Sequence, residues 1–182
     1  RRCLGDATMR NLTEMYMELS APIFSYLLRL SGDYDLAEEL TQETFLGALQ
    51  ALPKFREEAS VKTWLYAIAR NTYLSKINKS HPKGIVFTSF DEEFLDGGER
   101  SADPAEQLLQ KEQSLIMQRA IYCLPETYRT VIILREFEEL SYGEIAKILG
   151  KTENWVRVTF FRAKQKLKET ILALERGKES ED

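Results

Sequence analysis

The sequence has few of the residues that metal centres, disulfide frameworks and most catalytic sites require. Its 182 residues include only two cysteines and one histidine. Cys3 and Cys123 lie far apart without a Cys-x-x-Cys motif, and His81 stands beside Pro82 in a polar stretch. These residues indicate no zinc site, no disulfide framework and no histidine-based catalytic arrangement. We therefore expect reduced thiols and no catalytic residue, cofactor or metal, so a small helical hydrolase is the least favoured class.

Long apolar runs are also missing, and glycine and proline are scarce. No apolar run approaches the roughly 18 residues that span a bilayer, and no signal-peptide pattern opens the chain. Only nine glycines and five prolines occur, and apolar residues recur mostly at helical intervals. We expect a soluble, cytoplasmic, all-α protein without membrane insertion. Its length allows one medium domain or two small ones.

Charge is unevenly distributed along the chain, whose net charge is −4. Residues 54–83 hold seven basic and two acidic residues, residues 151–168 hold six and one, and residues 84–113 hold two and eight. Local charge, rather than net charge, sets contact with phosphates, and acidic surface elsewhere suppresses indiscriminate binding. This pattern predicts two nucleic-acid-binding segments in a protein that also has protein partners.

Hydrophobic periodicity divides the chain into two helical domains. Helices are predicted over about 12–30, 35–52 and 61–78, and again over about 104–124 and 125–137. Pro22 falls within the first of these and is expected to start or kink a helix. Between the two sets, residues 80–103 carry prolines, paired glycines and an acidic run. The sequence thus predicts a first domain over 1–79, a flexible acidic linker over 80–103 and a second domain over 104–182.

The predicted linker is richer in apolar residues than a free tether needs, so parts of it could dock on a partner. These residues are Ile85, Val86, Phe87, Phe90, Phe94 and Leu95.

A helix-turn-helix is predicted near the C-terminus. Ser141 and Glu144 form a Ser-x-x-Glu capping box at the start of the first helix. Gly150 is suited to the left-handed conformation that ends it, and Thr152 can cap the second helix. In that second helix, spacings of four, three and four place Val156, Phe160, Ala163 and Leu167 on one packing face. The basic opposite side is either a solvated surface or a DNA-binding surface.

Four segments together resemble one known family. They are GDYDLAEELTQETFLGAL (32–49), KFREEASVKTWLYAIARNT (54–72), LPETYRTVIILREFEELSYGEIAKILG (124–150) and RAKQKL (162–167). In this order they resemble bacterial RNA polymerase sigma factors of the extracytoplasmic-function (ECF) group of the sigma-70 family. The resemblance implies a first domain that docks on polymerase and melts the promoter −10 element. It implies a second domain that reads the −35 element.

The resemblance implies that the first domain contacts core RNA polymerase through a polar stripe on the helix after Asp35. Glu39, Gln42 and Glu43 share one side of that helix, opposite its apolar face. A merely solvated stripe is the alternative. By resemblance they contact the beta-prime clamp helices, and the beta subunit is a further partner.

The −10 strand is expected to bind the segment that combines cations, aromatic rings and an amide, the mixture that single-stranded DNA requires. The candidates are Phe55, Arg56, Ser60, Lys62, Trp64, Arg70 and Asn71. By resemblance, the connection from Phe55 to Ser60 captures a flipped base, and Asn71 reads another. Trp64 could equally be a core residue. Family members often continue with an Asp and an Arg-rich run, where this chain has Ser75, Asn78 and Lys79.

The −35 element is expected to bind the exposed side of the second helix of the helix-turn-helix. The candidates are Arg157, Val158, Phe161, Arg162 and Lys166. Arginine pairs with guanine, apolar side chains contact thymine methyl groups, and lysine contacts phosphate. The usual Gly-Thr-Val start of the family's helix is replaced by Asn154-Trp155-Val156, and Thr159 replaces the following Arg.

Promoter DNA and core polymerase are thus the expected partners, and the resemblance adds an anti-sigma factor. It also implies association with the nucleoid when polymerase is bound. The alternative is a stand-alone helix-turn-helix regulator whose first domain dimerises or senses a ligand.

Overall fold

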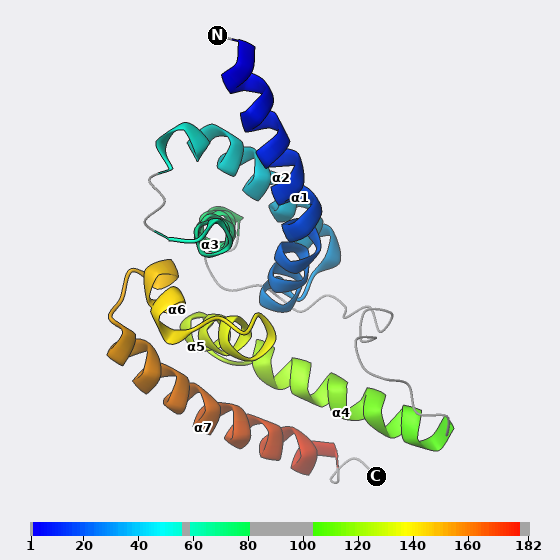
Figure 1. The fold of residues 1–182 in the computed structure, drawn as a ribbon. Coiled ribbons are helices and arrows are strands. Elements are labelled where there is room, and N and C mark those ends of the chain that lie inside the picture. Colours follow the sequence, from blue (N-terminus) through cyan, green and yellow to red (C-terminus); the bar gives the residue numbers. More distant parts are fainter. Residues whose placement is uncertain (1, 56–58, 81–103, 179–182) are drawn as a thin grey trace.

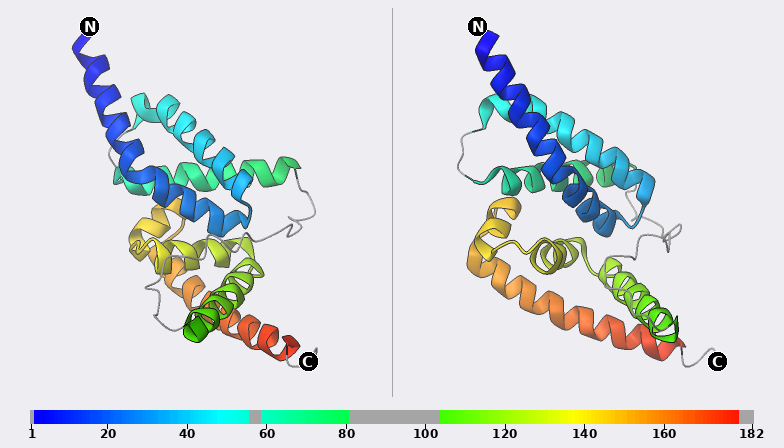
Figure 2. Two further views of the ribbon diagram at one scale, coloured as in Figure 1. Left: turned by 90° about the vertical axis from the view of Figure 1, so that its right-hand side faces the viewer. Right: turned by 45° about the vertical axis from the view of Figure 1, so that its right-hand side comes forward.

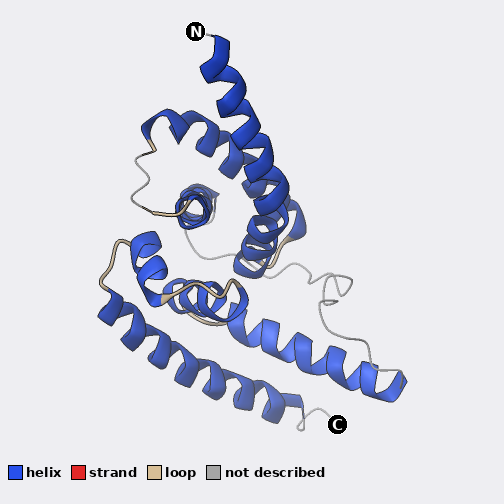
Figure 3. Cartoon of the chain, viewed as in Figure 1, coloured by secondary structure: helices blue, strands red, loops and turns tan. Residues whose placement is uncertain are grey.

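The computed structural model describes residues 2–55, 59–80 and 104–178, and these residues form helices joined by turns, with no strand among them (Figures 1 and 3). The elements are α1 (Arg2–Ser31), α2 (Tyr34–Ala51), η1 (Leu52–Lys54), α3 (Val61–Ser80), α4 (Pro104–Tyr122), α5 (Glu126–Ile132), η3 (Ile133–Phe137), α6 (Tyr142–Leu149) and α7 (Glu153–Lys178). The all-α class and the C-terminal helix-turn-helix are confirmed. Arg56 and the predicted linker, including its apolar residues and His81, lie outside the described residues. The domain boundaries therefore stay a prediction.

Helices α1, α2 and α3 pack together and are called the N-terminal domain below. A short turn at Gly32 (φ 71°) joins α1 to α2, and the Asp33 carboxylate caps α2 by accepting a hydrogen bond from Leu36 N at 2.9 Å. Helix α1 begins far before Pro22, so the prediction that this proline could start a helix is wrong. Ile23 and Leu27, both fully buried, follow the proline, and this tertiary packing offsets the backbone hydrogen bond that proline cannot make.

Helices α4 to α7 form the C-terminal domain. Helix α7 runs along α5, α4 and α6 and closes that domain on its outer side (Figure 1). The chain between α5 and α6 winds wider, as η3, and Glu138 N donates to Ile133 O at 3.2 Å in a π-helical bond. Glu139 then adopts a left-handed conformation (φ 56°) and redirects the chain toward α6.

The two domains pack against each other. Helix α3 lies against α6, and α1 contacts η3 and α4 (Figure 2). Tyr66 of the N-terminal domain and Leu134 of the C-terminal domain are both fully buried in one continuous apolar cluster. In all three views, α7 lies on the side of the C-terminal domain that faces away from α1 to α3 (Figures 1 and 2). Helix α3, which is predicted to bind the −10 strand, therefore lies against the other domain. Helix α7, which is predicted to bind the −35 element, lies on the far side of the C-terminal domain.

Candidate nucleic-acid interface

The helix-turn-helix is held by the caps that the sequence predicts. Ser141 Oγ accepts a hydrogen bond from Glu144 N at 3.2 Å, and Glu144 Oε2 accepts one from Ser141 N at 2.8 Å. Gly150 ends α6 in the left-handed conformation with φ 62°. Thr152 Oγ1 accepts from Trp155 N at 3.2 Å and so caps α7. These bonds satisfy backbone groups at both sides of the turn and fix the direction in which α7 leaves it.

The exposed side of α7 carries the residues predicted to contact the −35 element. Val156, Phe160 and Ala163 are buried against the rest of the domain, as the spacing predicts. Turned away from them is a set of exposed side chains that combines cations with apolar groups: Arg157, Val158, Phe161, Arg162 and Lys166. Phe161 is 61% exposed, although burying a phenylalanine side chain would stabilise the fold. An aromatic ring held in water beside arginines suits a ligand with apolar and anionic parts.

Arg157 is oriented by its neighbours. Its guanidinium pairs with Glu153 one turn earlier and lies 4.9 Å from the centre of the Tyr142 ring. Arg135 covers the same ring at 4.7 Å. Lys166 pairs with Glu169 at 3.2 Å on the exposed surface. Both contacts of Arg157 are solvent-accessible and weak, so this side chain can exchange them for a base or a phosphate.

Helix α3 carries most of the residues predicted to bind the −10 strand. Its first turn is capped by exposed Ser60, whose hydroxyl accepts from Thr63 N at 3.1 Å. The rings of Phe55 and Trp64 lie 4.7 Å apart, and both side chains are half-buried. Asn71 is exposed farther along the helix. The half-buried Trp64 leaves both of its predicted roles, in the core and at DNA, compatible with the structure.

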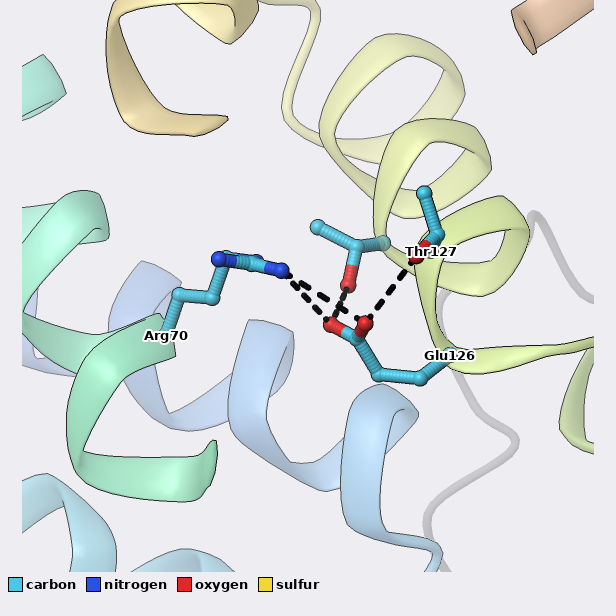
Figure 4. Close-up of polar contacts among 4 residues, drawn as sticks. Arg70, Glu126 and Thr127 are labelled. Atoms are coloured by element: carbon cyan, nitrogen blue, oxygen red, sulfur yellow. Dashed lines mark hydrogen bonds and ion pairs between the residues drawn. The ribbon is translucent and has the colours of Figure 1, made fainter. Parts of the chain in front are cut away.

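Lys62 and Arg70 of α3 instead face the C-terminal domain. Arg70 donates to Glu126 Oε1 at 3.2 Å and to Glu126 Oε2 at 3.5 Å, and Thr127 and Thr130 donate to the same carboxylate (Figure 4). Lys62 Nζ donates to the backbone carbonyl of Glu138 at 3.3 Å. Sequence reasoning did not foresee these contacts between residues far apart in the chain.

Glu138 is the most deeply buried acid at this junction, with 8% of its surface exposed. Tyr66 donates its hydroxyl proton to Glu138 Oε2, and Arg29 lies 3.8 Å from Oε1. Burial raises the pKa of Glu138, and the Tyr66 hydrogen bond and the charges of Arg29 and Lys62 partly oppose that shift. Burial is also the first cause that raises the pKa of Tyr66, so the phenol remains a hydrogen-bond donor.

The polar stripe on α2 is exposed, as predicted. Glu39, Gln42 and Glu43 lie on its outer side, and Lys76 of α3 pairs with both carboxylates. Sequence reasoning missed that Leu46 and Leu49 continue the same side, with 59% and 45% of their surface exposed. Their spacing from the buried Leu40, Thr44 and Ala48 is the signal that could have found them.

Two family models match the chain, one over each domain. Sigma-70 region 2 matches residues 15–81, and Sigma-70 region 4 matches residues 114–167. The chain belongs to the ECF group of the sigma-70 family. In this ECF sigma factor, α2 and α3 lie within the region 2 match, and the region 4 match covers α6 and the part of α7 up to residue 167.

Curated relatives cover most of this ECF sigma factor. RNA polymerase sigma factor YlaC of Bacillus subtilis is 31% identical over 170 residues, which are 88% of this chain and 92% of the relative. RNA polymerase sigma-H factor of Pseudomonas aeruginosa is 33% identical over an aligned region that spans 84% of this chain and 81% of the relative. ECF RNA polymerase sigma-E factor of Escherichia coli is 36% identical over an aligned region that spans 79% of this chain and 76% of the relative.

Two solved structures share the fold of this ECF sigma factor. Sigma factor RpoE from Bartonella quintana, in complex with the anti-sigma factor NepR, has a TM-score of 0.68 at 21% identity, covering 89% of this chain and 97% of that one. CnrH, in complex with the cytosolic domain of CnrY, has a TM-score of 0.65 at 19% identity, covering 91% and 90%.

Within residues 2–55, 59–80 and 104–178, no cluster of histidine, cysteine and acidic side chains could hold a metal ion. In the same part of the chain, no helix is long and apolar enough to cross a membrane.

Proposed function

We propose that this ECF sigma factor recruits core RNA polymerase to promoters and opens them, with region 2 acting at the −10 element and region 4 at the −35 element. The observation that carries this proposal is the pairing of both family matches in one chain with an exposed basic and apolar side of α7. In this proposal the protein acts by binding polymerase and DNA, and it makes or breaks no covalent bond. A stand-alone helix-turn-helix regulator is not favoured, because the relatives cover both domains.

Docking on polymerase is assigned to the outer side of α2. Glu39, Gln42 and Glu43 supply hydrogen-bonding groups there, and the exposed Leu46 and Leu49 supply apolar area. The beta-prime clamp helices of core polymerase are the proposed partner of this side, and the beta subunit is a further contact of the bound chain.

At the −35 element, Arg157 and Arg162 are assigned to base edges, Val158 and Phe161 to thymine methyl groups, and Lys166 to phosphate. At the −10 element, Lys62 and Arg70 are assigned to the strand backbone and Asn71 to a base, with Phe55, Arg56, Ser60 and Trp64 around a flipped base. An anti-sigma factor is proposed as a regulator, because RpoE and CnrH, which share the fold, were each solved with a protein partner.

Run-off transcription tests the proposal. Core polymerase is mixed with a library of bacterial DNA fragments, with and without the purified chain. We expect discrete transcripts only when the chain is present. The variant Gln42→Ala with Glu43→Ala should lose both these transcripts and co-purification with core polymerase. Transcripts that do not depend on the chain would contradict the proposal, and retained co-purification would contradict the docking assignment alone.

A further inference from the structure

Trp155 is exposed in the first turn of α7 and is not among the DNA contacts assigned above. Its exposed fraction is 36%, and among the described residues no acceptor forms a hydrogen bond with its indole N–H. Tryptophan combines a large apolar ring with one polar donor, so it suits a ligand that is apolar at one point and polar beside it. The reasoning below rests on the proposed function, since it takes α7 as the helix that enters the DNA groove.

The backbone that carries this ring is fixed by the turn before α7. Thr152 Oγ1 accepts from Trp155 N at 3.2 Å, and Thr152 O accepts from Val156 N at 3.1 Å. Val156 is itself fully buried. Lys151 N donates to Ala146 O at 2.9 Å across the turn. The ring therefore projects from a rigid base, and less conformational entropy is lost when it binds a ligand.

Lys151 places a positive charge over the same ring. Its Nζ lies 5.6 Å from the centre of the Trp155 ring. Arg157 pairs with Glu153, whereas no acid among the described residues forms an ion pair with Lys151. A cation–π contact at an exposed site is weak, so the ammonium group is available to an anion. Lys151 and Trp155 together present a cation, an N–H donor and an apolar ring at one point of the surface.

The surroundings of Lys151 and Trp155 favour DNA as the ligand. Residues 151–168 hold six basic residues and one acidic residue. Helix α7 lies on the side of the C-terminal domain that faces away from α1 to α3 (Figures 1 and 2). A duplex backbone offers phosphate oxygens to the ammonium group and to the indole N–H, and its deoxyribose offers an apolar surface to the ring. Neighbouring nucleotides of one strand thus supply a partner for each of the three groups.

Helical geometry places Trp155 at one edge of the exposed side of α7. Trp155 and Lys166 are eleven residues apart, which is close to three full turns, so they share this edge. Val158 and Phe161, which are assigned to thymine methyl groups, lie nearer the middle of the exposed side. A helix in the major groove, which is about 12 Å wide, turns its middle toward the bases and its edges toward the backbones. The edge that carries Trp155 and Lys166 therefore faces a backbone.

We propose that Lys151 and Trp155 bind one DNA backbone beside the −35 element. The Lys151 ammonium group and the Trp155 N–H donate to phosphate oxygens, and the Trp155 ring packs on a deoxyribose. Lys166 binds the same backbone about 16 Å farther along α7. Phosphate contacts position a protein on DNA but carry no sequence information directly. The two residues therefore fix how α7 lies in the groove, and Arg157 and Val158 read bases from that position.

Fluorescence tests this contact, because the chain holds only two tryptophans, Trp64 and Trp155. In the full chain with Trp64→Phe, all tryptophan emission comes from Trp155. The probe is a mixed-sequence duplex of about 20 base pairs at low salt, because backbone contacts require no promoter sequence. Saturating duplex should lower the acrylamide quenching constant of Trp155 at least about twofold, because the bound deoxyribose covers the ring. The reciprocal variant Trp155→Phe reports on Trp64 of α3, whose quenching constant should not change.

Salt dependence tests the lysine. Lys151→Gln should weaken binding of the same duplex about threefold at low salt and reduce the salt dependence of the binding constant by roughly one phosphate contact. Lys111→Gln is the matched control, because it removes the same charge from an exposed position of α4. It should leave both quantities unchanged. Trp155→Phe keeps an aromatic ring but loses the N–H donor, and it should weaken binding about equally on duplexes of different sequence.

Unchanged quenching of Trp155 at saturating duplex would overturn the proposal. Equal effects of Lys151→Gln and Lys111→Gln would overturn it too, and this decides the matter if Trp64→Phe does not fold. A changed base preference in Trp155→Phe would show that this residue reads a base, and protection of Trp155 by core polymerase without DNA would show a protein contact. Either outcome contradicts the backbone role. All of these results leave run-off transcription by the parent chain intact, whereas failure of the proposed function abolishes it.

Discussion

Among single residues, Arg157 has the best-defined surroundings on the exposed side of α7. Glu153 and the Tyr142 ring hold its guanidinium at the surface. There the planar group can form paired hydrogen bonds with the edge of a base. We expect Arg157→Ala to relax base preference at one −35 position at a cost of about 1–3 kcal/mol. Binding to promoter fragments that differ at single base pairs measures this effect. A loss of the same size at every sequence would contradict the base-reading role.

Lys166 should behave differently, because it is assigned to phosphate and exchanges an exposed ion pair with Glu169. Lys166→Ala should weaken DNA binding about equally at all sequences. It should also make the binding constant less dependent on salt concentration, by an amount equal to roughly one phosphate contact. Titrations at several salt concentrations measure that dependence. An altered base preference with the salt dependence of the parent chain would show that Lys166 reads a base instead.

The capping box gives Glu144 a pH dependence of known sign. Hydrogen bonds from the Ser141 hydroxyl and backbone N–H lower the pKa of Glu144, and Thr63 and Lys62 add to that shift. A lowered pKa in the folded state contributes stability that is present above the ordinary glutamate pKa and is lost as pH falls through the lowered value. Ser141→Ala should cost about 1 kcal/mol at neutral pH and less in acid. Urea unfolding at both pH values checks this, and an equal loss at both would contradict the assignment.

At the scale of the element, the turn between α6 and α7 depends on Gly150. Its φ of 62° is strained for any residue with a Cβ, although no atom lies within 4 Å of the position that a Cβ would take. Gly150→Ala should therefore cost about 1 kcal/mol through backbone strain alone. Gly47→Ala in α2 is the matched control, because its Cβ would meet Ile68 Cγ2 at an ordinary 3.5 Å. That control should be neutral or slightly stabilising. Equal unfolding midpoints for the two variants would contradict the strain argument.

The outer side of α2 is expected to serve binding rather than stability. Leu46→Ser with Leu49→Ser should change the free energy of unfolding by less than about 1 kcal/mol, because both side chains are exposed. Affinity for core polymerase should fall by at least about fivefold. Leu172→Ser on α7 is a control of similar exposure and should leave that affinity unchanged. Strong destabilisation by the α2 pair would mean that these leucines serve the fold.

Local signals predicted the elements well. The capping box, Gly150 and Thr152 define the helix-turn-helix as the structure has it, because caps depend on residues within one turn. The sequence was less informative about α1, which begins at Arg2 rather than near Leu12. It also did not predict the π-helical turn at η3, or that Glu138, which follows this turn, accepts a hydrogen bond from Tyr66 of the other domain. Short-range periodicity carries no signal for either feature.

At the scale of the whole molecule, the two domains pack in a way that the sequence could not predict. Tyr66 and Glu138 are 72 positions apart, and charge counts along the chain show where basic segments lie but not which acids face them. The basic segment around α3 looked available for DNA in the sequence. In the structure, two of its cations face the C-terminal domain, whereas the exposed cations of α7 have no such cover.

The central claim is that one chain reads a promoter at two places, with α3 at the −10 element and α7 at the −35 element. Sequencing of transcript 5′ ends tests it most directly, with core polymerase, a fragment library and the parent, Asn71→Ala or Arg157→Ala chain. The parent should start transcripts downstream of two shared elements at fixed spacing. Asn71→Ala should alter only the downstream element, and Arg157→Ala only the upstream one. Start sites without shared elements, or the same altered element in both variants, would contradict the claim.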